Sequence, residues 1–255
     1  MAYLMEQNIF NNKYTLVRFF QEEEYVETFR CGKIRMMSAK YYKKNEEKSK
    51  ELYNNRYDAF ENSNYIYNPN LDGTIQFVEP IGRERFTNMW VNPNVLCSPI
   101  IIGNDKLDEL TKISCFYILP IHNSPYKKLS SYVSNKVYNF GNYYCLIINQ
   151  IEFENRIKNG IIKYHNQKIT SGECFGPVEY IDEKNFNGKY GPFRKPSGLS
   201  WQNEYRIRVV TQDNNEPFWF EVDNLKDITI WGKTSELLDG MFNESGGLII
   251  SNYNS

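Results

Sequence analysis

Histidine is scarce in this sequence of 255 residues, and the common phosphate-binding motifs are missing from it. His122 and His165 are the only histidines, and neither lies in H-E-x-x-H or in another metal-ligand spacing. This argues against a histidine-centred hydrolase and against a zinc site, so we expect no bound metal. Neither G-x-G-x-x-G nor G-x-x-x-x-G-K-S/T occurs, which excludes the usual glycine-rich phosphate loops.

Long apolar runs and paired cysteines are absent as well. No stretch approaches the roughly 18 apolar residues that a membrane helix needs, and Met1 to Tyr14 lacks the basic end and apolar run of a signal peptide. The five cysteines are odd in number and widely spaced, which predicts reduced, mostly buried thiols. We therefore expect a cytoplasmic protein with no membrane contact.

The charges nearly cancel, because 30 basic side chains face 31 acidic ones. This balance does not indicate nucleic acid as a partner, since nonspecific binding to phosphates needs an excess of cations. Twenty Tyr and sixteen Phe suit surfaces that are apolar on one side and hydrogen-bonding on the other. Codon bias in an AT-rich genome would enrich Tyr equally well. No long Gly/Ser or Pro linker divides the chain, so we expect one domain over residues 1–255.

Strand patterns outnumber helix patterns along the chain. Lys13–Phe20 is a β-branched and aromatic run, and the acidic residues after it begin a helix that ends near Arg30 and Gly32. Ser38 is a candidate N-cap for a polar helix that runs to about Asn54. Further strands are predicted at Lys33–Met37, Thr74–Val78, Lys112–Leu119, Tyr143–Asn149, Ile161–His165, Val178–Ile181, Pro217–Val222, Asp227–Trp231 and Leu248–Ile250, and further helices at Gln150–Lys158 and Ser235–Phe242. Because strands and helices do not alternate strictly, we predict an α+β fold with a mixed, mostly antiparallel sheet.

The most informative stretch runs from Pro192 to Val210. It begins as a loop rich in Gly, Pro and cations and continues as an alternating pattern typical of a half-buried strand. Glu204 stands where the loop becomes the strand. A carboxylate at such a junction can face a ligand from a rigid platform, so Glu204 is the candidate catalytic residue.

Two arginines are candidates for binding an anion. Arg18 shares a strand face with Leu16 and Phe20, and a buried cation needs a carboxylate or a ligand anion beside it. Glu204 is the first candidate for its internal partner. In the box Arg56-x-Asp58-x-Phe60-Glu61, Arg56 could offer a planar fork of donors to a phosphate or could only fix the loop.

These residues, in this order, resemble a known group of sequences. Arg18-Phe19, Gly32–Met36, the Arg56 box, Ser114–Phe116 and the segment from Pro192 to Arg206 are similar to uncharacterised bacterial and phage proteins, which resemble distant members of the ADP-ribosyltransferase fold. The resemblance covers residues 14 to about 230. It implies a split β-sheet around a cleft for NAD. It also implies that Arg18 or Arg56 binds the pyrophosphate, Ser38 or Tyr41 the nicotinamide end, and that Glu204 is catalytic. The chain departs from the family in lacking a Ser-Thr-Ser strand and in having Gln202 where an acidic residue is common.

Two functions follow as hypotheses. The first is an NAD-dependent ADP-ribosyltransferase or NAD glycohydrolase that acts in phage or bacterial defence or counter-defence. The second is a non-catalytic protein that uses its Tyr-rich surface to block a partner, such as a host defence complex, because aromatic and arginine side chains favour protein interfaces.

Overall fold

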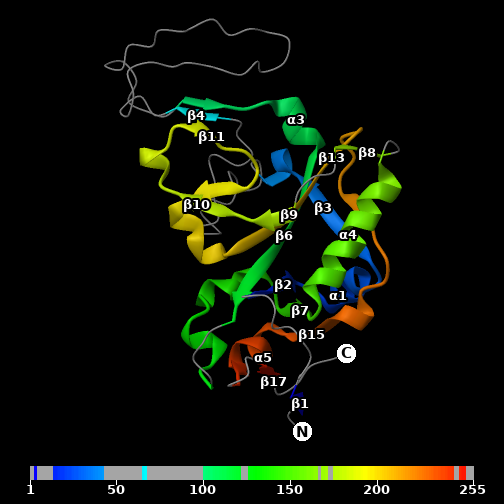
Figure 1. Cartoon of the computed structure of the whole chain (residues 1–255), viewed down its shortest axis with the longest axis vertical. Coiled ribbons are helices and arrows are strands. Elements are labelled where there is room, and N and C mark those ends of the chain that lie inside the picture. The colour runs from blue at the N-terminus through cyan, green and yellow to red at the C-terminus, as the bar shows by residue number, and fades with distance from the viewer. Residues whose placement is uncertain are drawn as a thin grey trace, which may run out of the picture. The chain divides into compact units, whose positions relative to one another are not determined.

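The computed structural model describes residues 3–4, 14–42, 65–67, 100–121, 126–165, 168–171, 175–243 and 247–250. Residue packing divides the chain into two compact units. Unit 1 comprises Met1–Ser38, Leu110–Val178 and Trp201–Ser255, and unit 2 comprises Ala39–Glu109 and Glu179–Ser200. Figure 1 labels many of their strands and helices. The prediction of a single domain over residues 1–255 stays a prediction.

Unit 1 is built on a nine-stranded sheet in which all described strand pairs are antiparallel. One path through the sheet has the order β14-β3-β6-β2-β7-β15, and β13 lies along β6 and also pairs with β8 and β9. The strands are β2 (Tyr14–Phe20), β3 (Lys33–Ser38), β6 (Thr111–Pro120), β7 (Tyr143–Ile147), β8 (Ile169–Ser171), β9 (Phe175–Pro177), β13 (Glu204–Thr211), β14 (Phe218–Glu221) and β15 (Thr229–Lys233). The predicted α+β class with a mostly antiparallel sheet is therefore confirmed.

Helices and a small second sheet complete unit 1. The helices are α1 (Glu23–Arg30), η2 (Leu129–Ser131), η3 (Asn135–Phe140), α4 (Gln150–Tyr164), η6 (Lys226–Ile228) and α5 (Thr234–Asp239). The second sheet has the order β1 (Tyr3–Leu4), β17 (Leu248–Ile250) and β16 (Met241–Phe242), with antiparallel pairing.

The nine-stranded sheet buries a separate core on each face. Because side chains alternate along a strand, Leu16 of β2 enters one core while Val17 enters the other. Helices α1 and α4 cover the Leu16 face through Val26, Phe29 and Phe153 and their neighbours (Figure 1). The Val17 face is covered by η2, η3, α5 and the small sheet.

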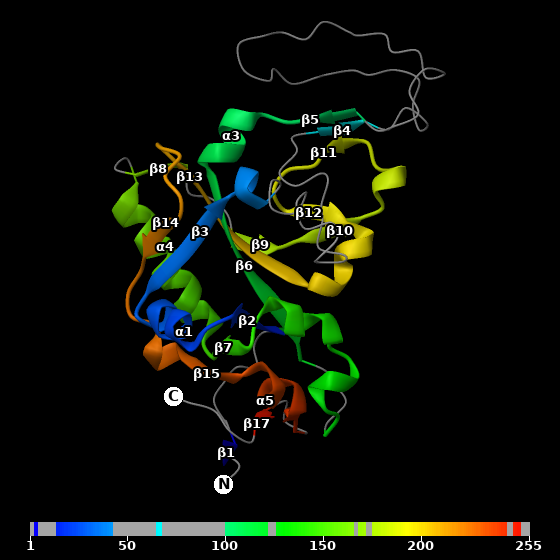
Figure 2. The same ribbon diagram turned by 180° about the vertical axis from the view of Figure 1, so that it is seen from behind.

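Strand β6 pairs with two strands in turn along one of its edges. Near its start, Lys112 and Ile113 pair with β3, whereas Tyr117–Pro120 at its end pair with β2. The other edge pairs with β13 from Thr111 to Tyr117. Strands β2 and β3 therefore diverge along the middle of β6, as Figure 2 shows.

Unit 2 contains short strands and little helix. Strands β11 (Gly188–Lys189), β4 (Tyr65–Tyr67) and β5 (Ile100–Ile102) form an antiparallel sheet, and β10 (Glu179–Ile181) pairs in parallel with β12 (Arg194–Pro196). Helices α3 (Asp105–Leu110), η4 (Glu183–Asn185) and η5 (Ser197–Gln202) follow or precede them, and the last residues of α3 and η5 belong to unit 1. Ile66, Ile181 and Tyr190 are the buried residues of its core.

The helix predicted at Ser235–Phe242 is too long, because α5 ends at Asp239 and Met241–Phe242 form β16. One strand prediction is wrong. The sequence predicts a helix that ends at Gly160 and a strand at Ile161–His165, but α4 continues through Gly160 to Tyr164. Gly160 is a packing glycine, because a Cβ there would lie 2.8 Å from the ring of Phe220 in β14. Because Gly160 has no side chain, α4 can pack closely against β14 at this position. The glycine therefore does not mark the end of the helix. The predicted strand at Thr74–Val78 and most of the polar helix after Ser38 lie outside the described residues.

Candidate functional site

Glu204 is the first residue of β13, which confirms its predicted place at a loop-to-strand junction. The residue before it, Asn203, has a left-handed backbone with φ of 42°. Its side-chain amide donates a hydrogen bond to the carbonyl of Ile118 at 2.5 Å, and its own carbonyl accepts from the Ile118 N–H at 2.6 Å. Asn is one of the few residues other than Gly that adopts this conformation readily. The turn therefore ties the start of β13 to β6.

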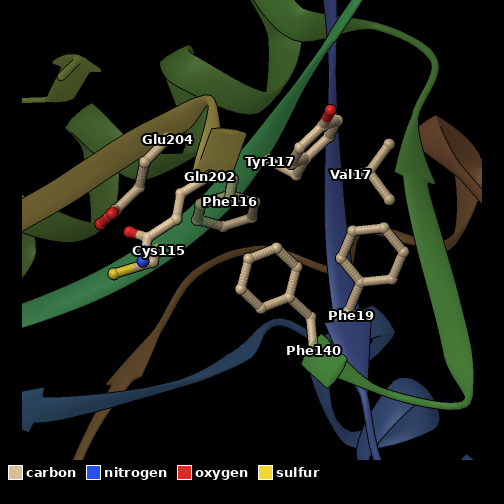
Figure 3. A pocket seen from close by; sticks show the side chains of 8 residues that line it. All are labelled: Val17, Phe19, Cys115, Phe116, Tyr117, Phe140, Gln202 and Glu204. Carbon is tan, nitrogen blue, oxygen red and sulfur yellow. The ribbon is translucent and has the colours of Figure 1, made fainter. Parts of the chain in front are cut away.

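A cavity of about 160 Å³ lies beside Glu204 in unit 1. It is lined by Val17, Phe19, Cys115, Phe116, Tyr117, Phe140, Gln202 and Glu204. Figure 3 shows Glu204, Gln202 and Cys115 grouped at one end, with Phe19, Phe140 and Val17 at the other. The cavity thus has a polar end and an apolar, largely aromatic end.

Strand register explains why Val17, Tyr117 and Glu204 share one face, whereas Phe116 faces the other core. Tyr117 of β6 is directly opposite Val17 of β2 on one edge and opposite Glu204 of β13 on the other. Residues directly opposite each other in a sheet point to the same side. Cys115 lies two residues before Tyr117 on β6 and directly opposite Arg206 of β13. Its side chain therefore points to the same face of the sheet as those of Tyr117 and Glu204.

Glu204 forms a buried ion pair with Arg206. The Nε of Arg206 lies 2.5 Å from the Glu204 Oε1, and the two residues are only 2% and 5% exposed. A carboxylate buried to this extent requires a positive charge beside it, because desolvation of an isolated ion is costly. Arg206 supplies that charge from the same strand face and fixes the carboxylate at the end of the cavity.

Aromatic stacking builds the apolar end. Phe140 stacks on Trp201 with 5.4 Å between centroids and 11° between planes, and Phe19 packs edge-on against Tyr117 at 6.0 Å. The Lys136 amine lies 5.0 Å from the centroid of the Trp201 ring. Burial raises the pKa of Tyr117 to about 12, against the opposing effect of its hydrogen bond with Asn203. The Tyr117 hydroxyl is therefore neutral at physiological pH.

Arg18 lies on the opposite face of the sheet from Glu204. It follows Val17, whose side chain faces the cavity, and its guanidinium instead lies 5.3–5.6 Å from the ring centroids of Phe20, Phe29 and Phe116. It donates hydrogen bonds to the Ser114 hydroxyl and, at 3.0 Å, to the Arg35 carbonyl. Arg18 thus connects β2, β6 and β3 where they diverge. The predicted internal pair of Arg18 with Glu204 does not form, since the register separates the two side chains and Glu204 pairs with Arg206.

The other predicted cofactor residues do not line this cavity. Ser38 is buried at the end of β3, where its backbone N–H donates to the Glu216 carboxylate at 2.8 Å. Tyr41 belongs to unit 2 and packs edge-on against Tyr42 with 5.8 Å between centroids. Arg56 lies outside the described residues.

Arg206 and several residues that line the cavity escaped the sequence-based prediction. Arg206 had a local signal, because it lies two residues after Glu204 on a strand and so shares its face. Cys115, Phe19 and Phe140 had none, since their approach to Glu204 depends on strand register and on the course of η3 between β6 and β7.

Comparison with protein families, with curated proteins and with solved structures finds no match for this chain. Within the described part of the chain, no helix is long and apolar enough to cross a membrane. The same residues contain no group of three or more His, Cys, Asp or Glu side chains placed to hold a metal ion.

Proposed function

We propose that unit 1 cleaves the N-glycosidic bond of NAD or a closely related nucleotide, as an NAD glycohydrolase or an ADP-ribosyltransferase. The observation that supports this proposal is the position of Glu204, which is held by Arg206 at the polar end of an aromatic-walled cavity. NAD would be consumed as a substrate. Such consumption fits the predicted role in defence or counter-defence.

The size of the cavity favours a single ring as its occupant. Cavities of about 150 Å³ bind benzene, whereas pockets for drug-sized ligands measure roughly 300–1,000 Å³. A volume of about 160 Å³ therefore suits the nicotinamide ring, with the rest of the dinucleotide outside. Phe19 and Phe140 offer apolar contact to a planar ring, and the Gln202 amide can hydrogen-bond to a polar group on it.

The chemistry requires a negative charge near the ribose. When the bond between nicotinamide and ribose breaks, the ring leaves with the bonding electrons and the sugar becomes an oxocarbenium-like cation. A fixed carboxylate stabilises that cation, because it is oriented before the charge develops. Water, or a side chain of a protein target, then bonds to the sugar carbon and releases a proton.

The fork of β2 and β3 along β6 supports, as part of this proposal, a split sheet of the ADP-ribosyltransferase type. The position of Arg18 departs from the arrangement that the resemblance implies. Arg18 is therefore not included in the proposed site, and the pyrophosphate would need other donors.

Nicotinamide release tests the proposal. Wild-type protein should release nicotinamide from NAD, and Glu204→Gln should abolish most of the release because it removes the negative charge. Glu23→Gln is the matched control, since Glu23 is an exposed residue at the start of α1. Circular dichroism should establish that all three proteins fold. Equal rates for wild type and Glu204→Gln would exclude this function.

A second candidate is the non-catalytic partner-binding protein. The observation that favours it is a set of large side chains on unit 1 that are 41–59% exposed. They are Tyr25, Tyr126, Tyr138 and Trp219. A partner that co-purifies in stoichiometric amount, is retained by Glu204→Gln and is lost with Tyr126→Ala or Tyr138→Ala would support this function.

A further inference from the structure

The residue just before Glu204 has an unusual backbone conformation. Asn203 has a φ of 42°, and Tyr126 is the only other non-glycine residue with a positive φ in the described part of the chain. This conformation is unfavourable for a residue with a Cβ, and it persists only where the surrounding contacts hold it. The turn at Asn203 is therefore maintained by the contacts around it.

These contacts are made with β6. The Asn203 side-chain amide donates to the Ile118 carbonyl at 2.5 Å, and the Asn203 carbonyl accepts from the Ile118 N–H at 2.6 Å. Burial raises the pKa of Tyr117, and a hydrogen bond with the Asn203 side chain opposes this effect. One side chain thus contacts two neighbouring residues of β6, and the first of them, Tyr117, is directly opposite Glu204.

The left-handed turn also accounts for the residues on either side of Asn203, which both line the cavity. Gln202 is the last residue of η5 and Glu204 is the first residue of β13, so one residue joins the helix to the strand. A negative φ at Asn203 would change the direction in which the chain enters β13. The relative direction of the Gln202 and Glu204 side chains would change with it.

We propose that Asn203 is a positioning residue for the nicotinamide-releasing reaction, because its left-handed turn and its amide fix the direction of the Glu204 carboxylate. The catalytic consequence rests on the proposed function, whereas the positioning of the carboxylate does not. A carboxylate stabilises a developing cation best when its orientation is set before the charge forms. No earlier residue of β13 supports Glu204, and the turn supplies that support.

Three variants separate the backbone of Asn203 from its amide. Asn203→Gly removes the amide but adopts the left-handed conformation readily, whereas Asn203→Ala removes the amide and disfavours that conformation. Asn224→Gly is the matched control. It removes a side chain that accepts from the Lys226 N–H at 2.8 Å, and Asn224 does not line the cavity.

Hydrogen exchange of two N–H groups, followed by nuclear magnetic resonance, reports the structure without any substrate. The Ile118 N–H reports the turn, and the Arg206 Nε–H, which donates to the Glu204 Oε1 at 2.5 Å, reports the carboxylate. Asn203→Ala should accelerate exchange at both groups about tenfold, the factor that corresponds to the cost of a left-handed backbone. Asn203→Gly should accelerate exchange less, and Asn224→Gly should leave both groups unchanged.

Nicotinamide release tests the catalytic consequence. Asn203→Ala should lower kcat about tenfold with the KM for NAD unchanged, because the walls of the cavity are not altered. Asn203→Gly should recover part of this loss, and Asn224→Gly should keep the wild-type rate.

The two measurements distinguish failure of this inference from failure of the proposed function. Equal exchange of the Arg206 Nε–H in wild type and Asn203→Ala would overturn the positioning role. Should Asn203→Ala fail to fold, wild-type exchange in Asn203→Gly would overturn it equally. Faster exchange with an unchanged kcat would overturn the role of Asn203 in the reaction. Faster exchange in the variant, with no nicotinamide released by the wild type, would retain the positioning role and exclude the proposed function instead.

Discussion

The ion pair between Glu204 and Arg206 determines how the polar end of the cavity is held. Arg206→Met removes the positive charge and keeps a long apolar side chain of similar reach. The Glu204 carboxylate then stays in a nearly water-free position without the guanidinium that lies 2.5 Å from it. Arg206→Met should therefore cost roughly 3–5 kcal/mol, because the buried carboxylate loses the opposite charge beside it.

The exposed pair between Lys128 and Asp239 offers a matched control. Its N–O distance is 2.9 Å, but its side chains are 58% and 63% exposed. Solvent screens such pairs, and they contribute about 0–1 kcal/mol. Lys128→Met should therefore change the free energy of unfolding by less than about 1 kcal/mol. The contrast between the two Met variants isolates burial as the cause, since geometry and substitution are similar.

A double variant distinguishes the effect of an unbalanced buried charge from the effect of altered packing. Glu204→Leu with Arg206→Met removes both ions, and apolar replacement of a whole buried pair is often close to neutral. Urea unfolding followed by tryptophan fluorescence gives each free energy, provided that the denaturant slope is unchanged. A loss for Arg206→Met no larger than that for Lys128→Met would show that burial does not strengthen the dependence of Glu204 on Arg206. A double variant that is destabilised more than Arg206→Met alone would contradict the assignment of the loss to an unbalanced buried charge.

Three further predictions concern the surrounding fold. Gly32→Ala should destabilise the protein by more than about 1 kcal/mol, because Gly32 has a φ of 87° and its added Cβ would lie 2.3 Å from a backbone carbonyl oxygen. Gly198→Ala, with no atom within 4 Å of its added Cβ, is the control and should be nearly neutral in the same urea assay. Burial raises the pKa of Cys145 and of Tyr117 to about 12, from 9.0 and 10.0. Their stabilising contribution is therefore complete below about pH 9 and is lost as the pH rises towards 12, by up to about 1.4 kcal/mol per pH unit and group. Unfolding free energies at about pH 8 and pH 10.5 should show this decrease, and Cys145→Val should reduce it; a flat profile would contradict the assignment. Arg18→Gln should cost about 2 kcal/mol through lost cation–π contacts and hydrogen bonds while nicotinamide affinity stays unchanged. A large loss of dinucleotide affinity at unchanged stability would instead restore Arg18 to the binding site.

Local pattern was sufficient for the elements around Glu204. Alternation in β13 and the Gly- and Pro-rich segment before it predicted that Glu204 begins a strand, and the structure confirms it. The same alternation implies that Arg206 shares the face of Glu204, although the predicted partner was Arg18. Such inferences succeed because the direction of a side chain in a strand depends on the backbone of that strand alone. Gly160 is the exception, since its role depends on contact with Phe220 and not on its neighbours in the sequence.

The α+β class and the strand that begins at Glu204 follow from local patterns in the sequence. The placing of Arg18 and Glu204 on opposite faces, and of Cys115, Phe19 and Phe140 around the cavity, depends on contacts between distant segments. The physical reason is strand register. A shift of one residue between β6 and its partners would reverse every face, and the packing of both cores, distant in sequence, fixes that shift.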